Sequence, residues 1–269
     1  MQIDRQHSDR YLIVYDDGRI GRGWPSGIEL TQTSGSPEVR LDHDIGEPMP
    51  QSNGAEPLDL SGRWPDTEHY DQNSPGILQR VADLDRRCYA SDIEKAFWVN
   101  TVRVPLSASY LSACALIQPD RILELGTGGD SAHSTGMFLA WLRTRPRAQL
   151  VSVDRHYLSH SWLRYRDYPE WTFVQGDSVH VMKQLYANRL PLPSVYDLIF
   201  IDSSHLYKET LAEIHQASLM TDAILFDDST VPDVKKAIDD FLYDHKAWLV
   251  RDVHPGVTLM ERHDYLPAT

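Results

Sequence analysis

The sequence predicts an α/β fold built on a doubly wound, mostly parallel sheet of seven strands, with a terminal antiparallel hairpin and an N-terminal extension. Two observations support this prediction. From residue 119 onward, short continuous apolar runs alternate with segments whose apolar residues recur at helical spacing. The apolar runs lack polar alternation, which is typical of strands buried on both faces of a parallel sheet that helices cover on each side.

The expected elements of this sheet follow in chain order. Strands are expected at 121–125, 149–153, 172–174, 197–201, 223–226, 248–253 and 257–261. Helices are expected at 131–142, 179–186, 208–218 and 231–245. The last two strands flank His254-Pro255-Gly256, a turn that predicts the terminal hairpin.

Three regions are expected along the chain: an extension over 1–75, a helical segment over 76–118 and the sheet domain over 119–269. In the extension, residues 11–15 and 19–24 flank an Asp-Gly pair, which predicts a β-hairpin. In the helical segment, the apolar spacing predicts helices over 76–85, 91–102 and 105–117.

Composition narrows the choice of partners and compartment. The formal net charge of −13 argues against nucleic acid and anionic membranes, because phosphates would repel so acidic a protein, and favours a small-molecule partner. The two cysteines, Cys88 and Cys114, form no CxxC pair, so neither a disulfide nor a zinc site is expected. No secretory segment or membrane span is recognisable, so a cytoplasmic protein is expected.

A glycine-rich turn follows the first strand of the sheet domain. Its sequence is Gly126-Thr127-Gly128-Gly129, and glycines there let the backbone turn sharply and approach a ligand. Dinucleotide-binding turns have a third glycine where this chain has Ser131. Glu124, just before the turn, would repel a pyrophosphate and suits a ligand with an ammonium and a sulfonium group.

Acidic residues also stand at the ends of the next two strands. Asp154 is positioned to accept hydrogen bonds from two ribose hydroxyls. Asp177, followed by Ser178, is positioned to accept one from an adenine amino group. Each could equally be a helix cap, but three acids at three successive strand ends favour a nucleotide site.

A second group of acidic residues follows the next two strands. Asp202 and His205 come after the strand at 197–201, and Asp227-Asp228 come after the strand that is expected beside it. Three neighbouring carboxylates repel one another unless a cation is present, and oxygen ligands suit magnesium, manganese or calcium. The alternative is that these acids cap helices and that His205 is a solvated surface residue.

The order Glu-x-Gly-x-Gly, strand-end acid and Gly-Asp-Ser resembles class I S-adenosylmethionine-dependent methyltransferases over about residues 105–263. The resemblance implies a Rossmann-like fold, with 119–269 as the catalytic domain, and S-adenosyl-L-methionine as methyl donor. The implied donor-binding residues are Glu124, Gly126, Thr127, Gly128, Ser131, Asp154, Arg155, Asp177 and Ser178. Asp130 departs from the pattern, because many members have glycine there.

The motif Ile-Asp-x-x-His-x-Tyr with the later acid pair is similar to the metal-dependent macrocin and mycinamicin sugar O-methyltransferases and cephalosporin-hydroxylase-like proteins. This resemblance implies that Asp202, Asp227 and Asp228 bind Mg²⁺ or a similar divalent cation, and that Asp202 and His205 are catalytic, His205 as the base. The family has Glu-Asp where this chain has Asp-Asp. The expected acceptor is a sugar or other hydroxyl of a secondary metabolite, as in antibiotic biosynthesis, and a homo-oligomer with contacts through 76–118 is expected.

Three other functions remain open from the sequence. They are a metal-independent N-methyltransferase, a non-catalytic adenosyl-nucleotide-binding protein and an NAD(P)-linked oxidoreductase, the last disfavoured by the missing third glycine. Aromatic side chains form either a substrate wall or part of the core: Trp98, Tyr110, Tyr157, Trp162 and Tyr165.

Overall fold

The computed structural model describes residues 10–17, 19–22, 103–127, 133–142, 145–156, 165–166, 168–254 and 256–263. The helices expected at 76–85 and 91–102, together with Gly128 and Ser131 of the glycine-rich turn, lie outside these residues. Within the described ranges, no helix combines the length and the apolar character that crossing a membrane requires.

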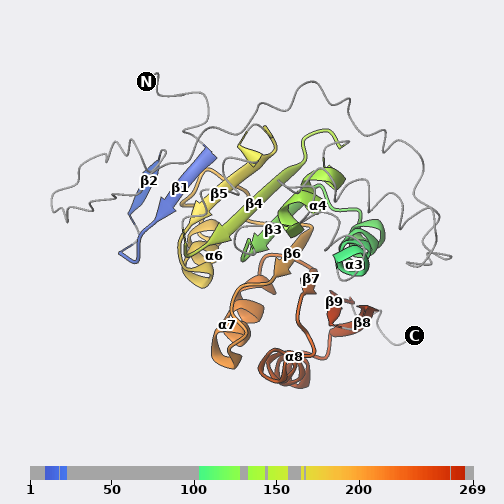
Figure 1. Cartoon of the computed structure of the whole chain (residues 1–269). Coiled ribbons are helices and arrows are strands. Elements are labelled where there is room, and N and C mark those ends of the chain that lie inside the picture. Colours follow the sequence, from blue (N-terminus) through green and yellow to red (C-terminus); the bar gives the residue numbers. More distant parts are fainter. Residues whose placement is uncertain are drawn as a thin grey trace, which may run out of the picture.

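The described part of the chain contains one sheet of nine strands in the order β2-β1-β5-β4-β3-β6-β7-β9-β8 (Figure 1). The strands are β1 (Tyr11–Val14), β2 (Ile20–Arg22), β3 (Arg121–Leu125), β4 (Gln149–Asp154), β5 (Trp171–Gln175), β6 (Leu198–Ile201), β7 (Ala223–Phe226), β8 (Trp248–His254) and β9 (Val257–Arg262). Strands β3 to β7 pair in parallel, whereas β9 is antiparallel to both β7 and β8. The predicted parallel sheet with a terminal antiparallel hairpin is confirmed.

The predicted N-terminal hairpin forms, and it extends the sheet beyond the seven strands expected from the later sequence. Strand β1 pairs antiparallel with β2 and in parallel with β5. Tyr11, Leu12 and Val14 are buried there, and the Tyr11 hydroxyl donates a hydrogen bond of 2.9 Å to Gln175. The hairpin was predictable from its turn, but its place beside β5 was not, because strand pairing depends on side chains far away in the sequence.

Helices cover both faces of the sheet, which confirms the doubly wound prediction (Figure 1). They are α3 (Arg103–Ile117), α4 (His133–Leu142), α6 (Ser178–Tyr186), α7 (Tyr207–Ala217) and α8 (Pro232–Asp244). Successive residues of a strand point to opposite faces, so Leu198 and Phe200 of β6 pack with α3 and α4. Ile199 and Ile201 pack on the other face with α6, α7 and α8.

Candidate active site at the carboxyl ends of the strands

Gly126 brings the glycine-rich turn against the end of β6. Its φ of +85° lies in the left-handed region, and a Cβ at this position would lie 2.0 Å from the backbone oxygen of Asp202. The backbone nitrogen of Gly126 donates a hydrogen bond to Val153, and that of Asp202 donates one to Leu125, both at 2.8 Å. The predicted donor turn and the first predicted metal ligand are therefore neighbours in the fold.

Glu124 is fully buried at the end of β3, and hydroxyl groups surround its carboxylate. Ser134 and Thr135 in the first turn of α4 donate hydrogen bonds of 2.6 and 2.8 Å, and Ser152 of β4 donates one of 2.5 Å. Burial raises the pKa of Glu124 to about 7, although the three hydroxyls favour its ionised form. The carboxylate thus joins β3, β4 and α4, and its direct contact with a cationic ligand stays a prediction.

Asp154 holds the backbone of the glycine-rich turn from the end of β4. One carboxylate oxygen accepts hydrogen bonds of 3.2 Å from the backbone nitrogen and the hydroxyl of Thr127. The other accepts one of 2.8 Å from the backbone nitrogen of His156. Asp154 is partly exposed, so a ligand in front of the turn can still reach it.

Asp177 has the helix-cap geometry that the sequence left open as an alternative. Its carboxylate accepts a hydrogen bond of 2.9 Å from the backbone nitrogen of His180 and is the N-cap of α6. The other oxygen forms an ion pair of 2.7 Å with Arg155, whose guanidinium also lies 3.4 Å from Glu209. Contacts of Asp177 and Arg155 with a donor stay predictions.

Glu213 of α7 is a buried acid that sequence reasoning missed. Ser178 and Ser203 donate hydrogen bonds to its carboxylate, with distances of 2.6 and 2.7 Å from the Ser203 hydroxyl to the two oxygens. Burial raises its pKa to about 7. The sequence held one signal, because at helical spacing Glu213 shares its helix face with Thr210 and Ala217, which are buried.

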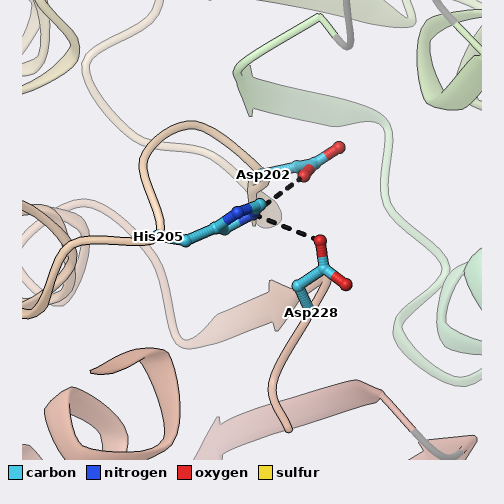
Figure 2. Close-up of side chains that lie close together, drawn as sticks. All are labelled: Asp202, His205 and Asp228. Atoms are coloured by element: carbon cyan, nitrogen blue, oxygen red, sulfur yellow. Dashed lines mark ion pairs between the residues drawn. The ribbon is translucent and has the colours of Figure 1, made fainter. Parts of the chain in front are cut away.

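Asp202, His205 and Asp228 converge at the ends of β6 and β7 (Figure 2). The Nε2 atom of His205 lies 3.8 Å from Asp202 Oδ1 and 3.3 Å from Asp228 Oδ2. One ligand atom from each residue falls within 4.8 Å of the others. Such a group can bring its two carboxylates to one divalent ion beside the Nε2 atom of His205.

The electrostatics of this cluster favour a cation. Burial and the neighbouring charges of Asp227 and Asp228 together raise the pKa of Asp202 to about 6, although the adjacent His205 lowers it. The carboxylates of Asp202 and Asp228 in turn raise the pKa of His205. Asp228 has a φ of +51°, a left-handed conformation that aspartate tolerates better than most residues.

Asp227, the remaining predicted metal ligand, is not part of the group formed by Asp202, His205 and Asp228. Its Oδ2 atom accepts a hydrogen bond of 2.7 Å from the hydroxyl of Tyr110 on α3. Tyr110 packs edge-on against Phe200, and it is buried, as is Tyr165. These two aromatic residues belong to the core, whereas Trp98, Tyr157 and Trp162 lie outside the described residues.

Similarity to known proteins is found among solved structures. No protein-family model matches the sequence, and no curated protein sequence matches it significantly. The SAH-bound methyltransferase PaMTH1 of Podospora anserina is 17% identical over 71% of this chain and 89% of its own, with a TM-score of 0.48. The O-methyltransferase of Bacillus cereus in complex with SAH is 15% identical over 70% of this chain and 91% of its own, with a TM-score of 0.45. The O-methyltransferase TomG of Streptomyces achromogenes, involved in tomaymycin synthesis and in complex with SAM, is 15% identical over 70% of this chain and 90% of its own. Its TM-score is 0.43.

Proposed function

We propose that this protein is an S-adenosylmethionine-dependent methyltransferase that methylates a hydroxyl of a small molecule with the help of Mg²⁺ or a similar divalent cation. The acceptor in this proposal is a sugar or other hydroxyl of a secondary metabolite. The main supporting observation is that Gly126 packs against Asp202, while His205 Nε2 lies within 3.8 Å of both Asp202 and Asp228. A donor turn and a cation site at one sheet edge would hold donor and acceptor side by side, and transfer between two bound substrates depends on that proximity.

The donor half of the proposed site comprises the ends of β3, β4 and β5. In this proposal the turn from Gly126 to Gly128 approaches the amino-acid end of the donor, and Asp154 accepts hydrogen bonds from the ribose. Asp177 and Ser178 contact the adenine. The negative charge of these strand ends favours a sulfonium ion over a pyrophosphate.

The acceptor half comprises the ends of β6 and β7. Asp202, Asp227 and Asp228 would hold the divalent cation, which lowers the pKa of an acceptor hydroxyl when bound. His205 would take the hydroxyl proton on Nε2. As the acceptor oxygen forms its bond to the methyl carbon, the bond between that carbon and the donor sulfur breaks, and its electron pair stays on sulfur.

Removal of the Asp202 carboxylate tests this proposal. Asp202→Ala should bind S-adenosylhomocysteine within about threefold of the wild type but lose methyl transfer by about a hundredfold or more, because cation affinity is lost. Calorimetry measures the ligand affinity, and transfer of a labelled methyl group to a panel of sugars and other hydroxyl compounds measures activity. Wild-type turnover by Asp202→Ala with the metal chelated would overturn the metal mechanism.

A further inference from the structure

Glu213 connects the donor half and the acceptor half of the proposed site. It lies on α7, which follows β6, and its carboxylate accepts hydrogen bonds from Ser178 at the start of α6 and from Ser203 after β6. These serines belong to the two loops that leave the sheet edge after β5 and β6. The side chain is 99% buried, since only 1% of Glu213 is exposed.

Among the residues that the structure describes, Glu213 has no ion-pair partner. The nearby guanidinium of Arg155 is bound to Asp177 and Glu209, and both of those acids repel a charge on Glu213. Burial raises the pKa of Glu213 to about 7. Keeping this side chain ionised at neutral pH therefore costs free energy of folding. A residue of this kind stabilises local geometry mainly through its hydrogen bonds.

We propose that Glu213 is a positioning residue that fixes the separation between the adenine end of the donor site and the cation site. Ser178 directly follows Asp177, the proposed adenine contact, and Ser203 directly follows Asp202, the proposed cation ligand. A single carboxylate thus positions both chemical groups without contacting donor or acceptor. This inference rests on the proposed function, because it assigns the two loops to donor and cation.

Four substitutions test the two connections. Ser178→Ala should weaken binding of S-adenosylhomocysteine alone, and Ser203→Ala should weaken binding of Mn²⁺ alone. Glu213→Leu should weaken both, each by about tenfold, as expected when an outer-shell partner is lost. Glu213→Gln should stay within about threefold of the wild type, because its amide can accept from one hydroxyl and donate to the other. Calorimetry measures the first affinity, and electron paramagnetic resonance of free Mn²⁺ measures the second.

Ile214→Ala on the same helix is the matched control for lost stability. Ile214 is buried in the core between α7 and the sheet, so the variant should lose stability while the folded protein keeps both affinities. If Glu213→Leu binds both ligands as Ile214→Ala does, Glu213 is structural only and the inference is wrong. Failure of the wild type to bind either ligand would overturn the proposed function and this inference together.

Discussion

The two halves of the sheet edge use their carboxylates in opposite ways. At the ends of β3, β4 and β5, Glu124, Asp154 and Asp177 accept hydrogen bonds from hydroxyls, backbone amides or a guanidinium, and they hold loops in place. At the ends of β6 and β7, Asp202 and Asp228 lie on either side of His205 and near Asp227. The first half is a framework in which hydrogen bonds and one ion pair satisfy the carboxylates. The second half retains excess negative charge, which a bound cation would balance.

Replacing Gly126, where the two halves meet, should have the largest effect. Gly126→Ala places a Cβ 2.0 Å from the Asp202 backbone oxygen at a φ of +85°, so we expect a loss of about 4 kcal/mol or more in unfolding free energy. Thermal and urea denaturation measure it. In the control Gly21→Ala, the added Cβ meets Tyr15 at an ordinary 3.4 Å, and the change should stay within about 1 kcal/mol. A Gly126→Ala protein as stable as the wild type would contradict the close packing of the two halves.

The pH dependence of the unfolding free energy tests the role of Glu124 at the ends of β3, β4 and β5. Its pKa is about 7 in the folded protein and 4.5 ordinarily, so between these values the unfolded chain releases a proton that the folded protein keeps. Titration of Glu124 should therefore lower the unfolding free energy of the wild type by about 3 kcal/mol as the pH rises from 4.5 to 7, and this contribution should level off above that. In Glu124→Gln this contribution should disappear.

The comparison is made by urea denaturation of both proteins at each pH. Other groups, such as Asp202 and Glu213, titrate in both proteins, so the difference between the two curves isolates Glu124. Parallel curves for wild type and variant would show that Glu124 is ionised throughout and that its three hydroxyls outweigh its burial.

Cation binding at the ends of β6 and β7 should have a smaller effect on stability than the two changes above. Mg²⁺ or Mn²⁺ at a hundred times its Kd should stabilise the wild type by about 2.7 kcal/mol, measured as a rise in Tm. Asp202→Asn should lose this rise. Asp222→Asn should keep it, because Asp222 is exposed at the opposite end of β7. An equal rise in both variants would place the cation elsewhere.

The positions of the acids at the sheet edge could be predicted from the sequence. Parallel strands end at a common edge, so Asp202 after one strand and Asp228 after its neighbour had to approach each other once β6 and β7 paired. The same reasoning placed Gly126 and Asp154 together. It needs strand boundaries, which the apolar pattern indicates, and the pairing of strands that follow one another in the chain, which was assumed for the strands at 197–201 and 223–226.

The side-chain partners at this edge could not be predicted in the same way. Tyr110 reaches Asp227 from a helix 117 positions earlier, and Glu213 reaches Ser178 from 35 positions later. Such contacts depend on how far a helix is rotated and displaced against the sheet, which residue spacing within the helix does not determine. For the same reason, the enclosure of Glu124 by three hydroxyls became visible only in the structure.

The pairing of β1 with β5 has a consequence for how the chain folds. Tyr11 and its partner Gln175 are 164 positions apart, so β1 is synthesised long before the strand it joins. Contacts of such sequence separation form late and slowly, and until then the apolar edge of β5 is open to other chains. Removing β1 and β2 would therefore leave β5 with an unprotected edge, and the expected result is aggregation.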